Sequence, residues 1–221
     1  TAYCAQEVAG NLISGNGGHG LRCHTSYAGS CSPLLSGNEI SYNQGWGVQR
    51  SQGPNYNARS RPKLINNIIH NNRDGGAYFI FYHSYNNQYD VPTLLNNTIA
   101  HNNAYGVRSG RPWIINTIIW GHDDDLDVVV DRVSHSDIGD GEYAGINHNL
   151  SLDPHFVDAS QQDYHVKSTS PVINMGDSTH SDLPVFDVDG DSRIMGRGVD
   201  IGADEFFIMN EAPVFTSTPV T

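Results

Sequence analysis

Hydrophobic and polar positions recur along this chain with a period much longer than that of one helix or strand. The pattern N-x-I-x-x-N-x-x-x-G, followed by an apolar residue, occurs four times and is followed by a partial copy. The copies begin at Asn11, Asn38, Asn67, Asn97 and, for the partial copy, Asn116. Asn and Gly disfavour helix interiors, and no helical periodicity runs between the copies. A repeat of roughly 20–30 residues with short apolar segments predicts an all-β parallel solenoid.

Each position of the repeat has an expected place in a coil. Ile at the third position and the apolar residue after the Gly should point into the core. The Asn side chains should lie at corners, where Asn tolerates left-handed backbone and can bond to its equivalent in the next coil. The Gly should allow a tight bend before the next strand. Loops over 24–36 and 49–63, protruding from a basic coil of about twenty residues, explain the unequal spacing.

Composition narrows the class of protein. The chain has 12 Lys and Arg against 24 Asp and Glu, a formal net charge of -12, which makes it a poor binder of nucleic acid. No apolar run approaches the roughly 20 residues of a membrane span. Only 16% of the residues are charged and 23 are Gly, a composition typical of an extracellular β protein. We therefore expect a secreted or cell-surface protein.

The three cysteines all lie near the N-terminus. Cys4 and Cys23 are one basic coil apart and could be stacked equivalents. Cys23 and Cys31 bracket a short loop and could instead form a disulfide. The two pairings exclude each other, and an odd count leaves one thiol over.

The repeats resemble those of right-handed parallel β-helix proteins of the pectate-lyase-like superfamily. A second resemblance lies in three C-terminal segments, which are similar to the last coil and cap of secreted bacterial and archaeal β-helix proteins. These segments are 118-IIWGHDDDLDVVVDRVSHSDIGDG-141, 153-DPHFVDASQQDYHVKSTSPVINMGD-177 and 187-DVDGDSRIMGRGVDIGADEF-206. The resemblance implies a single right-handed parallel β-helix over residues 1–206, in five or six coils, with the last coil and cap at about 118–206.

Both ends of the sequence suggest a piece of a longer protein. Residue 1 is Thr, and the tail 210-NEAPVFTSTPVT-221 is dense in Pro and Thr. We expect residues 207–221 to link the β-helix to an immunoglobulin-like module. In that arrangement the β-helix is a monomer within a longer modular chain.

Equivalent outward positions on successive coils form the candidate functional face. The residue before the repeat Gly is His19, Trp46, Gly75 or Tyr105, and the second residue after it is Arg22, Gln49, Tyr78 or Arg108. Aromatic rings can stack on sugars, and guanidinium groups bind carboxylates in two-pronged geometry. We therefore predict a polysaccharide-binding groove that includes Trp46, Gln49, Tyr78 and Tyr105. The alternative is an ordinary strand surface, where aromatic residues are common.

The sequence gives less support for catalytic residues than for the binding groove. The segment 17-GGHG-20 resembles the G-H-G of polygalacturonases, which are β-helix hydrolases, but the motifs that accompany it there are not in the expected order, and the repeat alone explains His19. A lyase of acidic glycans needs a general base near the sugar C5 proton and charge neutralisation on the uronate. Arg22, Arg50 and Arg108 are possible bases by position only.

Two acidic segments could bind a cation. The run 123-DDDLD-127 offers oxygen ligands for Ca²⁺, although such runs are more often solvated loops. Asp187, Asp189 and Asp191 alternate as in part of an EF-hand loop, but the Gly is misplaced and no Glu stands at the twelfth position. The main expectation is a structural turn with Asp caps and an Arg193 partner, and a structural Ca²⁺ site is the alternative.

Two functional hypotheses follow. The first is a secreted protein associated with polysaccharide binding or degradation, either as a lyase of acidic glycans or as a hydrolase. The second is a non-catalytic structural or adhesive module of a cell-envelope protein. The first rests on analogy of fold, which does not by itself define a reaction.

Overall fold

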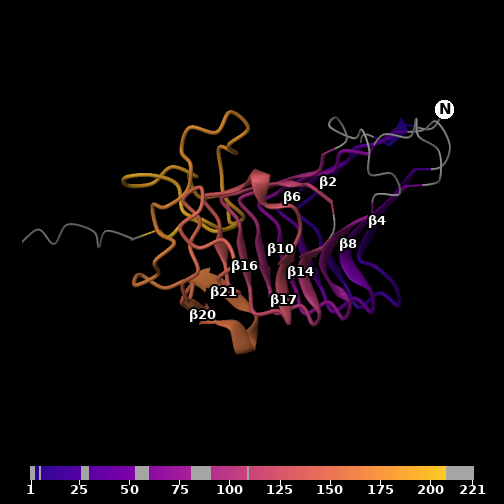
Figure 1. Ribbon diagram of the computed structural model, residues 1–221, viewed down its shortest axis with the longest axis horizontal. Coiled ribbons are helices and arrows are strands. Elements are labelled where there is room, and N and C mark those ends of the chain that lie inside the picture. The colour runs from indigo at the N-terminus through magenta and orange to yellow at the C-terminus, as the bar shows by residue number, and fades with distance from the viewer. Residues whose placement is uncertain are drawn as a thin grey trace, which may run out of the picture.

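The chain winds into a stack of coils with three parallel β-sheets along its sides (Figure 1). The computed structural model describes residues 3–4, 6–25, 30–52, 60–80, 91–108 and 110–207. The first sheet contains β2 (Glu7–Ala9), β6 (Leu34–Ser36), β9 (Lys63–Ile65), β12 (Thr93–Leu95), β15 (Trp113–Ile115) and β18 (Val133–Ser134). The second contains β3 (Leu12–Ser14), β7 (Glu39–Ser41), β10 (Ile68–His70), β13 (Thr98–Ala100), β16 (Ile118–Trp120) and β19 (Asp137–Ile138). The third contains β4 (Leu21–Thr25), β8 (Trp46–Gln52), β11 (Gly75–Phe79), β14 (Tyr105–Arg108) and β17 (Asp124–Asp127).

Successive coils stack in register at the positions that the repeat marks. Ile40, Ile69, Ile99 and Ile119 are direct partners on neighbouring strands of the second sheet, and all four are fully buried. The apolar residues after the repeat Gly face the same core from the third sheet; they are Leu21, Val48, Ala77 and Val107. The inward positions of the four full copies are therefore confirmed. The partial copy is displaced by one residue, because Ile119 and not Ile118 is the strand partner of Ile99.

Three predicted segments lie partly outside the described residues. The predicted loop over 24–36 contains the end of β4, all of β5 (Ser30–Cys31) and all of β6, and its residues 26–29 lie outside the described part of the chain. The predicted loop over 49–63 begins later than expected, because β8 continues to Gln52, and residues 53–59 lie outside the described part of the chain. The predicted linker over 207–221 also lies outside it, apart from Phe207. The linker therefore stays a prediction.

Two ladders of Asn side chains run along the corners of the coils. In the first, each side-chain amide donates to the side-chain oxygen of the next, at 2.9–3.1 Å, through Asn11, Asn38, Asn67 and Asn97. The second runs through Asn16, Asn43, Asn72 and Asn102 at 2.8–2.9 Å. The left-handed residue is the one before each ladder Asn, as at Asn66 (φ 55) and Tyr42 (φ 56), so the expected corner is displaced by one position. The ladder predicted from the sequence is present.

The repeat Gly has a different role from the bend expected from the sequence. Gly47 and Gly76 lie inside β8 and β11, and neither has a positive φ. A Cβ on Gly47 would lie 2.9 Å from the carbonyl oxygen of Gly76 and 2.6 Å from a methyl group of Ile69. Gly is therefore required because neighbouring coils approach too closely for any side chain.

The C-terminal region both covers the end of the stack and runs back along its side. Tyr143 packs into the core cluster, and its hydroxyl donates to the Val128 carbonyl at 3.4 Å, so the segment around it closes the last coil. The hairpin of β20 (Phe156–Asp158) and β21 (Asp163–Val166) follows (Figure 1). Its Tyr164 ring lies 4.8 Å from the ring of His70 in β10, so the hairpin packs against an earlier coil. We call residues 151–207 the flank segment.

Corner residues of the coils hold the flank segment. Asn66 accepts from the buried guanidinium of Arg193 at 2.6 Å and donates to the Phe186 carbonyl at 2.6 Å. Asn96 donates to the carbonyls of Asp200 and Gly202, both at 3.3 Å. Polar left-handed corner residues therefore serve a second purpose as docking points.

The cysteines are arranged in a way that the sequence did not predict. Cys4 is the strand partner of Cys31 in the short parallel pair of β1 (Tyr3–Cys4) and β5 (Ser30–Cys31). Cys23 is in register with Arg50, so the expected stacking of Cys4 on Cys23 is wrong. The buried Cys23 sulfur lies 3.2 Å from the Cys31 carbonyl oxygen.

Removal of one ladder side chain should destabilise the stack. Asn72→Ala deletes donors to Asn102 and Ile40 and an acceptor for Asn43, all of them buried. We expect a loss of about 2–4 kcal/mol in the free energy of unfolding, measured by chemical denaturation. Asn103→Ala, at the exposed neighbouring position, should change stability by less than about 0.5 kcal/mol. Equal effects of the two substitutions would contradict a structural role for the ladder.

Asp137 should make the stability of the fold depend on pH. The residue is fully buried, and burial is the main cause that raises its pKa from an ordinary 3.8 to about 7, against the opposing effect of a hydrogen bond from the Leu152 amide. The folded chain therefore keeps a proton that the unfolded chain loses above pH 3.8, so stability should fall between pH 3.8 and 7. The loss should not exceed about 4 kcal/mol.

Asp137→Asn should remove this part of the pH dependence of unfolding, measured by denaturation at several pH values. The matched control is Asp123→Asn, which changes an exposed carboxylate. An unchanged slope in Asp137→Asn would show that this carboxyl group does not hold the proton.

Candidate functional site

The outward face of the third sheet brings together the side chains predicted for the groove. Gly75 is the direct partner of both Trp46 and Tyr105, and Tyr78 is the partner of both Gln49 and Arg108. Arg22 extends the second row, because it pairs with Gln49. We call this face the aromatic column: Arg22, Trp46, Gln49, Tyr78, Tyr105 and Arg108.

Trp46 is the base of the aromatic column. Its ring lies over Gly75, where no side chain competes for space, and only 7% of the residue is exposed. The Tyr78 ring lies 4.8 Å from it and the Tyr105 ring, nearly parallel, lies 6.0 Å from it. Trp46 therefore supports the two tyrosines, which are the more exposed rings and the ones available to a ligand.

Arg108 completes the outer surface of the aromatic column. Its guanidinium carbon lies 4.2 Å from the centre of the Tyr105 ring and 5.9 Å from that of Tyr78, in cation–π geometry. The Arg108 Nε donates to Asp127 at 3.3 Å, and both side chains are roughly half exposed. Tyr105 and Asp127 thus fix the direction of a cationic group on this face.

The remaining candidate catalytic residues differ in accessibility. Arg22 is exposed on the face. Arg50 is fully buried and donates to the Ile80 carbonyl at 2.7 Å, so it lies inside the coil, away from any ligand on the face. His19 accepts a hydrogen bond at Nδ1 from the Trp46 backbone at 3.0 Å, and burial, with Arg22 second, lowers its pKa. A structural role, acceptance of a hydrogen bond from the next coil, therefore explains the presence of His19 at this position of the repeat.

The acidic run at 123–127 is a strand with mixed exposure, contrary to the expected solvated loop. Within β17, Asp124 is the partner of Tyr105, and Asp127 is the partner of Arg108. Asp125 points inward, where it contacts His122 Nδ1 at 2.6 Å. His122 Nε2 in turn accepts from the last side chain of the second ladder, Asn102, at 3.1 Å. The run thus extends the face and ends a ladder.

The three carboxylates that were candidates for Ca²⁺ do not converge. Asp187 Oδ1 accepts from the backbone amides of Asp189 and Asp191, at 2.9 and 2.8 Å, and its Oδ2 accepts from the Glu205 amide at 2.9 Å. This is the capped turn that was the main expectation. Arg193 was expected to pair with the carboxylates of this turn. Its guanidinium instead forms an ion pair with Glu205, at 3.7 Å from Oε2.

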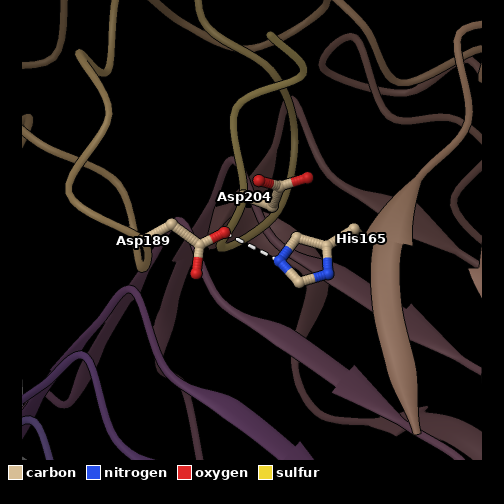
Figure 2. A group of neighbouring side chains, drawn as sticks. All are labelled: His165, Asp189 and Asp204. Atoms are coloured by element: carbon tan, nitrogen blue, oxygen red, sulfur yellow. Dashed lines mark hydrogen bonds and ion pairs between the residues drawn. The ribbon is translucent and has the colours of Figure 1, made fainter. Parts of the chain in front are cut away.

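Asp189 instead belongs to a group of ligand-type side chains in the flank segment (Figure 2). His165, Asp189 and Asp204 each offer one ligand atom, and these atoms all lie within 4.8 Å of one another. His165 Nε2 lies 2.7 Å from Asp189, and Nδ1 lies 2.5 Å from Asp163. We call His165, Asp189 and Asp204 the flank cluster.

Charge is concentrated in the flank cluster. Burial by itself lowers the His165 pKa, but the hydrogen bond to Asp163 and the charges of Asp204 and Asp189 outweigh it and raise the pKa to about 9. Burial, opposed by His165 and reinforced by Asp187 and Asp189, raises the Asp204 pKa to about 6. Three carboxylates therefore surround one imidazole.

Sequence reasoning found some of these positions and missed others. The repeat register correctly aligned the aromatic column. The sequence does not indicate that His165 and Asp204 meet, because 39 positions separate them. The only signal was the D-Y-H segment, in which an Asp two residues before a His can orient the ring.

A family model agrees with the architecture. Residues 2–111 match the family model described as "Right handed beta helix region". A solved structure described as "Crystal structure of pectate lyase Pel9A" aligns with 91% of this chain at 14% identity and a TM-score of 0.49. The chain spans 60% of the length of that structure. No curated protein sequence matches the chain.

The three stacked parallel sheets, together with the family match over residues 2–111, define the fold. The chain is a right-handed parallel β-helix. Among the described residues, no helix has the length and apolar character needed to cross a bilayer.

Gly75 should be essential for the aromatic column. A Cβ there would collide with the Trp46 ring and lie 2.7 Å from the Tyr105 carbonyl oxygen, and the φ of 151° is unfavourable for other residues. Gly75→Ala should cost about 1–3 kcal/mol of unfolding free energy and shift the tryptophan fluorescence by displacing the ring. Gly18→Ala, where the new atom meets nothing within 4 Å, is the control. Unchanged fluorescence and stability would refute this packing.

Proposed function

We propose that this β-helix binds acidic polysaccharide along the aromatic column, as part of a secreted or cell-surface protein. The observation that carries the proposal is the position of Arg108 over Tyr105, 4.2 Å from the ring centre, beside Tyr78. A sugar ring can stack on a tyrosine face while its carboxylate meets the neighbouring guanidinium. Such pairs of ring and charge are what a uronate-containing glycan requires.

Repetition along the stack supports a polymeric ligand over a small one. Arg22, Gln49, Tyr78 and Arg108 occupy one continuous row through direct strand pairing. Equivalent residues on successive coils form an extended surface. Neighbouring parallel strands lie about 4.8 Å apart, so the row presents polar and aromatic groups at regular short intervals. A linear polymer can contact several coils at once.

The arginines at the two ends of the row limit where an acidic ligand can bind. The protein as a whole is acidic, with a net charge of -12, and the β17 end of the face carries Asp124 and Asp127. The acidic chain should therefore lie over the β4–β14 part of the face, between Arg22 and Arg108. A lyase would use one of these arginines as its base, and Arg22 is the more exposed.

A second candidate function is a non-catalytic binding or spacer module of a cell-envelope protein. The burial of Arg50 favours it, because it removes one of the four candidate catalytic residues from the face, and the Nδ1 of His19 is occupied by the Trp46 amide. Both candidates share the binding surface. They differ in whether a bound glycan is cleaved.

Arg108→Gln should weaken binding of an acidic oligosaccharide such as oligogalacturonate by about tenfold. The cause is the loss of the charged group that Tyr105 and Asp127 hold in place, and isothermal titration calorimetry would measure the dissociation constant. Arg111→Gln is the matched control, because Arg111 is also an exposed arginine paired with an aspartate, Asp131, but lies outside the aromatic column. Equal affinities for wild type and Arg108→Gln would reject the assigned surface.

The same incubation distinguishes the two candidates. New ultraviolet absorbance from unsaturated sugar ends, lost in Arg22→Gln or Arg108→Gln, would establish a lyase. Binding without absorbance or new reducing ends would establish the non-catalytic module. The absence of binding to pectate, alginate, chondroitin and neutral glycans by folded protein would refute the proposal.

A further inference from the structure

We infer that the flank cluster of His165, Asp189 and Asp204 is a binding site for a transition-type divalent cation, with Zn²⁺ as the best match. The three ligand atoms lie within 4.8 Å of one another and come from three separate segments. They lie on β21, in the turn capped by Asp187, and near the end of the flank segment (Figure 2). This site is distinct from the aromatic column and does not depend on the proposed function.

The orientation of His165 is the first argument for the site. Asp163, which is not one of the three ligands, contacts Nδ1 at 2.5 Å and directs Nε2 toward Asp189 and Asp204. A carboxylate that holds the distal nitrogen of a histidine is the usual arrangement behind a metal-bound imidazole. It fixes the tautomer and the plane of the ring before any ion binds.

The distances fit an ion of small radius. Tetrahedral Zn²⁺ with nitrogen and oxygen ligands at about 2.0–2.2 Å places its ligand atoms roughly 3.4 Å apart. The Nε2–Asp189 contact is 2.7 Å, so the pair would open by less than about 1 Å to admit the ion. Asp189 is an exposed residue on a short turn, and its side chain has the freedom to make this movement.

The charges also call for a cation. The three carboxylates of Asp163, Asp189 and Asp204 surround one imidazole in a half-buried space. A divalent ion bound by Nε2, Asp189 and Asp204 would neutralise this negative charge, and any proton on Nε2 would be released to solvent. One imidazole with two carboxylates favours Zn²⁺ over Ca²⁺, which prefers six to eight oxygen ligands.

The side chain of Asp189 is not needed to form the turn that holds it. Asp187 caps the turn through Oδ1 and accepts from the Glu205 amide through Oδ2, whereas Asp189 contributes only its backbone amide to the cap. Ion binding would tie β21 to the last residues of the flank segment. We therefore expect bound Zn²⁺ to raise the unfolding temperature by several degrees, reversibly with chelator.

The test is calorimetric titration of the chelator-treated, complete chain with Zn²⁺, and with Co²⁺ for its visible spectrum. We expect one site with a dissociation constant in the micromolar range or tighter. Asp189→Asn and Asp204→Asn should weaken binding at least tenfold, and Asp163→Asn should weaken it about 10–100-fold. Asp191→Asn, an exposed carboxylate of the same turn, should bind as wild type does.

As a control for folding, the unfolding temperature of each variant is measured in the presence of chelator. Binding is then compared only among variants whose unfolding temperature matches that of wild type. Three results would overturn the inference. The first is a millimolar dissociation constant of wild type for Zn²⁺. The second is that Asp191→Asn weakens binding as much as Asp204→Asn does. The third is selective binding of Ca²⁺ that depends on Asp191. A tetrahedral Co²⁺ spectrum that is lost in Asp204→Asn would support it.

Discussion

Backbone amides at the corners of the coils must find hydrogen-bond acceptors, and this requirement controls how the coils stack. Each coil turns sharply inside a stack, where water cannot reach the backbone amides, and an unpaired buried amide is costly. The side-chain oxygen of the ladder Asn in the next coil supplies the acceptor, as in Asn38 N to Asn67 at 3.1 Å and Asn43 N to Asn72 at 3.1 Å. The same side chain donates to carbonyls of the coil before it. Stacking and corner formation are therefore one event.

In the last coils, other residue types replace Asn at the ladder positions. In the first ladder, Thr117 and Ser136 replace Asn and still present an oxygen to the preceding amide, before Asn149 ends the series. In the second ladder, His122 takes the next position and is held by the buried Asp125. Shorter side chains suffice for the last coils because only the acceptor function has to be kept.

The flank segment and the aromatic column use the coil stack in different ways. The flank segment is held by the left-handed residues Asn66, Asn96 and Asn116, whose side chains point out of the corner and bond to its backbone. The aromatic column is a direct product of strand register, in which an absent side chain at Gly75 gives room to Trp46. One surface thus depends on corner geometry, and the other depends on sheet geometry.

The sequence by itself determined the coil. Its period, the inward Ile column, the ladders and the row from Arg22 to Arg108 all follow from residues at fixed offsets, because a solenoid translates sequence spacing directly into stacking. The reason for the repeat Gly did not follow, since the atoms that exclude a side chain at Gly47 belong to the next coil. The inward direction of Arg50 was likewise decided by its position in β8.

The contacts of the flank segment became evident only from the three-dimensional structure. Arg193 reaches Asn66 across 127 positions, and Asp204 meets His165 through a fold with no repeat to set its spacing. Contacts of this kind depend on where an irregular segment packs, which side-chain periodicity does not specify. The architecture was therefore readable from local pattern, whereas the flank cluster, the strongest new site, required the three-dimensional arrangement.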